Sequence, residues 1–386
     1  MTAAGSGTSA ISRWSSAGQW PNPWQRATGY VVVLAGAGAA GLAFGLWDGE
    51  RPERVAASAA QPDPGVLTTW GLPLARLVVV VAVVGTVGML AGGLLLPRQD
   101  GKLAPAALRC LRSAAWAALA WAVAMPALLV LSWSDFTGRP ATQATFAQIF
   151  GEPKPYPDAL PYLYGAGLAL VIAAAAAITR TMPGVLVVLL LCAYNLLPLT
   201  TRGQQMDNPI IGAVVTVHVL AIAVWVGSLA ALLAHARRSP ALLAVALPRF
   251  NRLALACFVA VGVFGLIAAW INLGSAAELR GSHFGMLVLY KAEALVALGV
   301  FGWWQRRRIL PDVRRELGQR PFVRFAAIEI VVMVATIGLG IALSSTAAPA
   351  APDPSPPMDS SKTYGKISAP PLHVPGVTMG MPAILR

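Results

Sequence analysis

Long apolar segments recur along the whole chain, and this feature limits the possible folds more than any other. A transmembrane helix needs about 20 consecutive apolar residues, and in lipid only helices and closed barrels satisfy the backbone hydrogen bonds. The sequence therefore predicts an all-α, polytopic bundle of about nine membrane-spanning helices. The apolar runs are 28–47, 73–96, 113–133, 163–179, 183–200, 209–234, 250–273, 284–305 and 322–345.

The composition agrees with a lipid environment. Hydrophobic residues make up 56% and charged residues 12% of the chain, whereas soluble domains are about one-quarter charged. The formal net charge of +13 would suggest nucleic-acid binding in a soluble protein. Here the arginines lie mostly in short loops between apolar runs, where they set the orientation. We therefore expect the lipid bilayer as the surrounding medium and no nucleic-acid partner.

The charges of the loops alternate along the chain. Basic loops at 97–112, around Arg180, at 235–249 and at 306–320 are separated by loops that are balanced or acidic. Cytoplasmic loops carry the excess of lysine and arginine. The alternation therefore predicts a cytoplasmic N-terminus and a C-terminal tail on the outer side.

The sequence divides into four regions. Residues 1–27 form a Ser/Gly/Ala-rich segment that we expect to be disordered, and 28–204 form a five-span membrane region. Residues 205–349 form a four-span region, which holds most of the ionisable groups at membrane depth. Residues 350–386 are rich in proline, and this composition predicts a disordered tail.

The four-span region carries the candidate functional residues. His218 and Trp225 lie seven residues apart, on one stripe of the same helix. In the next-to-last span, His283, Met286, Tyr290 and Glu293 also share one stripe, which we expect to run inward from the outer surface, whereas Lys291 points to a different side. His218, Lys291 and Glu293 lie roughly 12 to 15 Å below the outer ends of their spans. They could therefore share a plane near the middle of the bilayer.

These residue types suggest copper chemistry. Imidazole and thioether groups suit copper, and ionisable groups inside a membrane are costly and usually functional. Three scattered cysteines without a C-x-x-C pair argue against a thiolate site. The candidate copper ligands are His218, His283, Met286, Glu293 and Glu329, with His373, Met379 and Met381 as possible ligands in the tail; Lys291 and Trp225 are predicted to be structural or ion-pairing.

The same region resembles the copper resistance protein D (CopD) family over residues 209–349. The similarity rests on His218 with Trp225-x-Gly227, on the sequence RFNRLA from Arg249, and on Phe284-Gly285, Lys291 and Glu329. The resemblance implies a multi-pass protein of the bacterial plasma (inner) membrane, linked to copper uptake or copper homeostasis. It reaches His218, Lys291 and Glu329 as functional positions.

The five preceding spans also resemble the front of a longer architecture, in which a CopD region is followed by a cytochrome c oxidase assembly (CtaG-type) domain. That second domain is missing from the sequence. The resemblance implies possible partners, either an extracytoplasmic copper-binding protein or an oxidase assembly partner.

Three functions follow as hypotheses. The first is copper transport or binding along a His/Met/carboxylate path, which breaks no substrate bond and so predicts no enzymatic activity. The second is an assembly factor or scaffold for maturation of the oxidase copper site. The third is a b-type haem electron carrier, which needs two facing histidines; only His218 is placed deep in a span, so haem is not expected as the cofactor.

Overall fold

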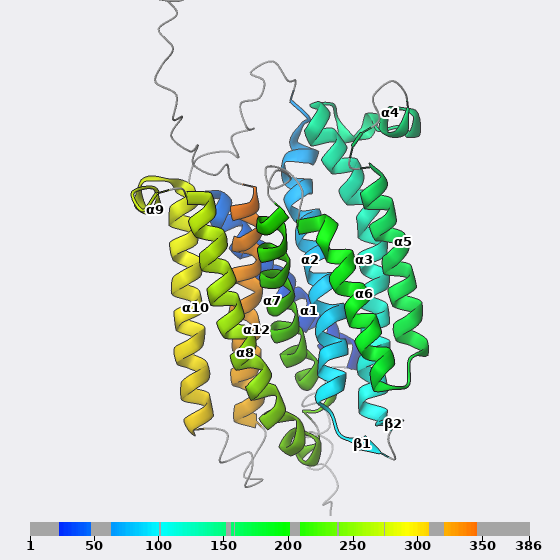
Figure 1. Cartoon of the computed structure of the whole chain (residues 1–386), viewed down its shortest axis with the longest axis vertical. Coiled ribbons are helices and arrows are strands. Elements are labelled where there is room, and N and C mark those ends of the chain that lie inside the picture. Colours follow the sequence, from blue (N-terminus) through cyan, green and yellow to red (C-terminus); the bar gives the residue numbers. More distant parts are fainter. Residues whose placement is uncertain are drawn as a thin grey trace, which may run out of the picture. The chain divides into compact units, whose positions relative to one another are not determined.

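The computed structural model describes residues 23–47, 63–99, 102–151, 156–157, 159–200, 209–237, 239–273, 275–308 and 320–345. Almost all of these residues are helical (Figure 1). The helices are α1 (Pro23–Trp47), α2 (Val66–Leu95), α3 (Pro105–Thr137), α4 (Phe146–Phe150), α5 (Ala159–Ile178), α6 (Met182–Thr200), α7 (Pro209–His235), α8 (Pro240–Leu273), α9 (Glu278–Gly281), α10 (His283–Arg308) and α12 (Arg320–Ser344). A short 3-10 turn, η1 (Ala141–Gln143), precedes α4, and two-residue strands β1 (Arg98–Gln99) and β2 (Lys102–Leu103) pair between α2 and α3.

Each of the nine predicted apolar runs forms a helix. Seven of the described helices are long and apolar enough to cross a membrane, and α1 and α6 contain shorter apolar segments at Val32–Leu46 and Met182–Leu197. The break between α5 and α6 falls at Arg180, so the short pair of runs is correctly split. The prediction of an all-α polytopic membrane protein is confirmed.

Helices α2, α3, α5 and α6 pack beside one another in the first half of the chain (Figure 1). Their interior is filled by large side chains that are almost completely buried, such as Trp121, Leu111 and Met125. The amide of Asn195 on α6 donates to the Gly165 carbonyl on α5 at 3.1 Å. Close packing of the apolar side chains and this polar contact between helices hold the group together.

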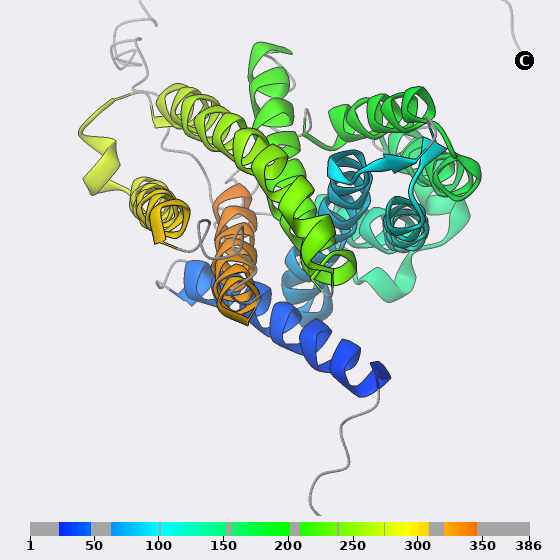
Figure 2. The same ribbon diagram turned by 90° about the horizontal axis from the view of Figure 1, so that it is seen from below.

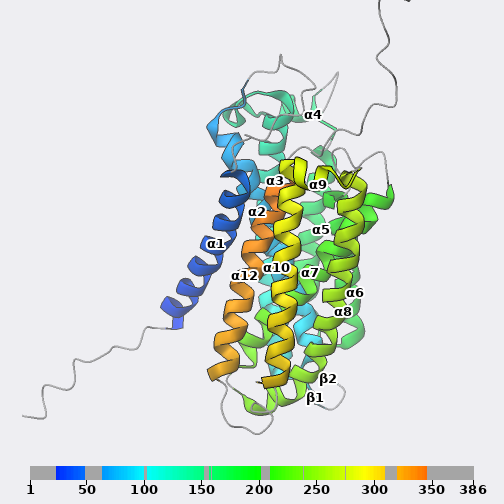
Figure 3. The same cartoon turned by 90° about the vertical axis from the view of Figure 1, so that its left-hand side faces the viewer.

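Small residues join the first half of the chain to the second. On α1, Gly41 packs against the backbone of Ala335 on α12, and Gly38 faces Gly338 in the same helix pair, which lies side by side in Figure 3. Gly88 on α2 packs directly against Gly227 on α7. Glycines let helix backbones approach closely, as is common in membrane proteins. The described residues accordingly form one compact unit, and the predicted boundary near residue 205 is crossed by two closely packed helix pairs.

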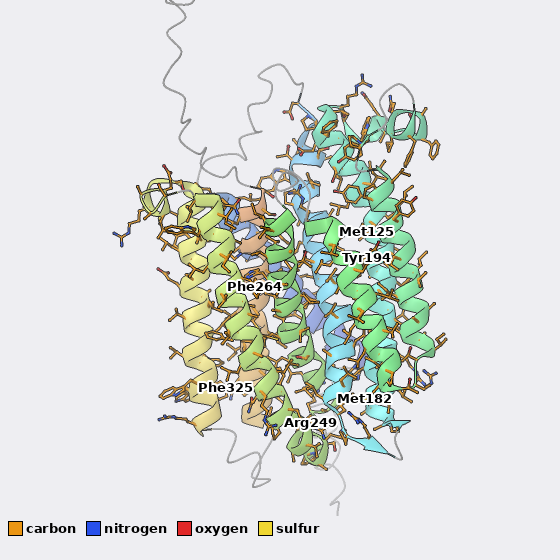
Figure 4. All side chains as sticks on the ribbon, viewed as in Figure 1. Met125, Met182, Tyr194, Arg249, Phe264 and Phe325 are labelled. Carbon is orange, nitrogen blue, oxygen red and sulfur yellow. The ribbon has the colours of Figure 1, made fainter. Side chains whose placement is uncertain are left out.

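The spans α7, α8, α10 and α12 surround the candidate site. Helices α7 and α10 begin at the end where α8 and α12 finish, and we call this the outer end, following the predicted orientation. Arg249 lies at the opposite, inner end (Figure 4). Its guanidinium donates to the carbonyls of Leu95 and Leu96 at 3.1 and 3.4 Å, where α2 ends. This contact caps carbonyls that a helix end leaves without partners.

Candidate functional site

His218 lies on α7 and is oriented by α8. Its Nδ1 lies 3.1 Å from the backbone carbonyl oxygen of Val261. The ring reaches this oxygen over Gly265, where an added Cβ would lie only 2.9 Å from the His218 Cε1 atom. Glycine at position 265 therefore makes room for the imidazole.

The Val261 contact fixes the tautomer of His218. A carbonyl oxygen can only accept a hydrogen bond, so Nδ1 carries the proton and donates it. The Nε2 atom is then left with its lone pair, and no residue in the described part of the chain forms a hydrogen bond with it. A neutral imidazole whose other nitrogen is fixed by a backbone carbonyl is the usual form of a metal-binding histidine.

Lys291 projects from α10 into the same interior. Its Nζ lies 3.5 Å from the position that a Cβ would occupy at Gly340 on α12, and its charge acts on the His218 ring. The neighbouring inward positions Leu287 and Leu298 are buried. No hydrogen bond or ion pair to the Lys291 ammonium is present among the described residues. The structure thus brings Lys291 close to His218.

Glu329 is buried on α12 with 6% of its surface exposed, but it lies at a different depth from Lys291. It precedes Gly340 by eleven residues, which corresponds to about 16 Å along a helix. Met333, 3% exposed, and Thr336 follow Glu329 on the same helical stripe. The α12 stripe, which we define as Glu329, Met333, Thr336 and Gly340, therefore extends from the level of Lys291 toward the inner end.

The predicted stripe on α10 exists but does not face His218. His283 Nε2 lies 3.2 Å from the Gly45 carbonyl oxygen on α1, and the Tyr290 ring contacts Phe44 of the same helix at 5.5 Å. Met286 is half-buried and Glu293 is exposed. These residues follow the α1 edge and the outward face of α10, because Lys291 occupies the inward face.

Trp225 is buried on α7, below His218 on the same stripe. Its ring meets Phe258 of α8 edge to face at 5.9 Å, and Phe258 in turn packs on Gly299 of α10. The indole Nε1 has no hydrogen-bond partner within the described ranges. Trp225 therefore packs against α8, and Phe258 extends this packing to α10.

No cluster of three or more His, Cys, Asp or Glu side chains that could hold a metal occurs among the described residues. Cys110, Cys192 and Cys257 are free and buried on three different helices. His218 and His283 bond to carbonyls of different helices and do not form a facing pair. The predicted tail ligands His373, Met379 and Met381 lie outside the described residues.

Sequence reasoning missed two polar contacts. Arg76 lies within the second apolar run, and its guanidinium donates to the Ser345 hydroxyl at 3.3 Å, just beyond the end of α12. A lone arginine inside an apolar run was the signal for it. His235, the last residue of α7, has its Nε2 3.1 Å from the Ser113 hydroxyl on α3.

The helices and the buried polar groups define a polytopic α-helical membrane protein. Residues 244–343 match the family model described as Copper resistance protein D, CopD. This match confirms the CopD resemblance for a segment that includes most of α8, all of α10 and nearly all of α12. No curated protein and no solved structure matches the chain.

The matched segment contains several residues on which the resemblance rests, among them Arg249, Lys291 and Glu329. His218 and Trp225 precede it, on α7. However, Val261 and Gly265, which hold the His218 ring, lie inside it. The backbone that orients His218 thus belongs to the CopD segment, although His218 itself precedes that segment.

Proposed function

We propose that the protein handles copper within the membrane, with His218 as the central ligand between α7 and α8. The match to Copper resistance protein D carries this proposal. The Nε2 lone pair supports it, because imidazole is a good copper ligand and the Val261 hydrogen bond already orients the ring. A multi-pass plasma-membrane protein that moves or binds copper fits these observations.

The path we propose runs from His218 along the α12 stripe. Met333 offers a thioether, which suits cuprous copper, and Glu329 offers a carboxylate further toward the inner end. His218 and Met333 lie at successive depths, so an ion would pass between single ligands and never meet a closed cage. Weak, successive sites allow an ion to enter and leave.

Lys291 has a defined role in this proposal. An ammonium group close to the His218 ring lowers the affinity for a cation by Coulomb repulsion. We propose that this repulsion keeps copper from being trapped at His218. The path that we propose does not include His283, Met286 or Glu293, because His283 contacts α1 and Glu293 is exposed.

Copper accumulation in cells tests the proposal. Cells that express the His218→Ala variant should accumulate about tenfold less copper than cells with the wild-type chain, because a tenfold change corresponds to about 1.4 kcal/mol, a modest cost for losing one ligand. His235→Ala is the matched control, since this histidine contacts Ser113 near the inner end. Equal accumulation by the His218→Ala variant and the wild type, at equal expression, would contradict the proposed role.

A further inference from the structure

Glu293 lies on the outward face of α10, deep within the span. It is exposed and follows the first residue of α10, His283, by ten residues, which places it about 15 Å below the outer end. Neither a hydrogen bond nor an ion pair joins its carboxyl group to the described part of the chain. A carboxyl group surrounded by lipid at this depth is costly.

Residues on the inward face of α10 pack against α1 and α12. Leu287 approaches Gly45 of α1, and Lys291 reaches Gly340 of α12. Near the inner end, the Phe301 ring contacts Phe325 of α12 at 5.7 Å. Figure 2 shows α10 at the edge of the group of helices, with only the short helix α9 beyond it among the described helices. Glu293 therefore cannot turn inward without unpacking α10.

The residues around Glu293 include two alanines and two valines, all of them exposed. We define the α10 outer face as the exposed residues Ala292, Glu293, Val296, Ala297 and Val300. Small side chains allow a second helix to approach closely in a membrane, and interhelical hydrogen bonds stabilise such contacts. The outward stripe of α8 differs, because Leu255, Val259, Val263 and Leu266 are all apolar.

We propose that the α10 outer face binds the same face of a second copy of this chain. A carboxyl group that holds a proton is both a donor and an acceptor, so two Glu293 side chains related by a two-fold axis satisfy each other. Two-fold interfaces use the same patch on both partners, and Ala292 and Ala297 beside Glu293 leave room for the backbone of a second helix. This proposal does not depend on copper handling.

Cysteine cross-linking of the full chain in membranes tests the pairing. In the Val296→Cys variant, a membrane-permeant bifunctional methanethiosulfonate should give a covalent dimer. Val259→Cys on α8 is the matched control, because Val259 and Val296 are 53% and 64% exposed and lie at similar depths. It should give only the background level, as should the wild type, whose three cysteines are buried.

A second substitution tests the role of the carboxyl group. Adding Glu293→Ala to Val296→Cys should lower the cross-linked fraction about tenfold, which corresponds to about 1.4 kcal/mol and to the range of one interhelical hydrogen bond. Adding Glu293→Gln should preserve cross-linking, since the amide also donates and accepts. Cross-linking of Val296→Cys at the level of Val259→Cys, or unchanged cross-linking with Glu293→Ala, would overturn the proposal.

Discussion

At the scale of single residues, the imidazole of His218 can approach the backbone of α8 because residue 265 is a glycine. The Val261 carbonyl is reached only because position 265 has no side chain. This arrangement leaves the lone pair of Nε2 for the copper ion that we propose it binds. The orientation of His218 thus depends on a residue that makes no polar contact of its own.

The Gly265→Ala substitution tests this dependence. An added methyl group 2.9 Å from Cε1 must displace the ring, so copper accumulation should fall toward the level of the His218→Ala variant. Gly262→Ala is the matched control on the same helix, because a Cβ there would lie 3.6 Å from Leu295, an ordinary contact distance. Wild-type accumulation by a well-expressed Gly265→Ala variant would show that the ring orientation is unimportant.

At the scale of helices, α1 and α2 hold the four later spans in place. Helix α1 packs on α12 through Gly38 and Gly41, and α2 packs on α7 through Gly88. Since α7 carries His218 and α12 carries Glu329, each of these early helices supports a helix of the candidate site. We infer that the first spans are needed to keep the later ones in register.

Replacing Gly41 by leucine should separate α1 from α12. The side chain would meet the backbone of Ala335, which cannot move as easily as a side chain, and overpacking of this kind costs about 1 to 3 kcal/mol. We expect a lower midpoint of thermal unfolding in detergent. Gly36→Leu is the control, because nothing lies within 4 Å of its added Cβ. An unchanged midpoint for Gly41→Leu would rule out close α1–α12 packing.

At the scale of the whole molecule, the nine apolar helices of the described part of the chain could be predicted, because membrane thickness sets a length that hydropathy reveals directly. The sequence could not predict whether each polar stripe faces the neighbouring helices or the outside of the bundle. Periodicity shows that His283, Met286 and Glu293 share a face of α10, but the face that neighbouring helices cover is decided by packing. In this chain, Lys291 faces inward and Glu293 faces outward.

The depth of Glu329 in the membrane could have been predicted from the sequence by counting residues. Counted from the outer end, Lys291 lies eight residues deep on α10 and Glu329 fifteen residues deep on α12, so about 10 Å separates their backbones along the membrane normal. The side chain of Lys291 extends toward Gly340, which lies nearer the outer end. The distance in depth between the ammonium group and Glu329 is therefore larger than the distance between their backbones. The tautomer of His218 could not be foreseen, because it depends on Val261, far away in the sequence.

The most direct test of copper binding at His218 is X-ray absorption at the copper K-edge. The full-length protein would be loaded with copper(I), and the tail ligands would be removed by His373→Ala, Met379→Ala and Met381→Ala so that the tail cannot contribute. We predict the scattering pattern of a bound imidazole, and its loss when His218→Ala is added. Identical spectra with and without His218 would contradict the assignment of copper to this histidine.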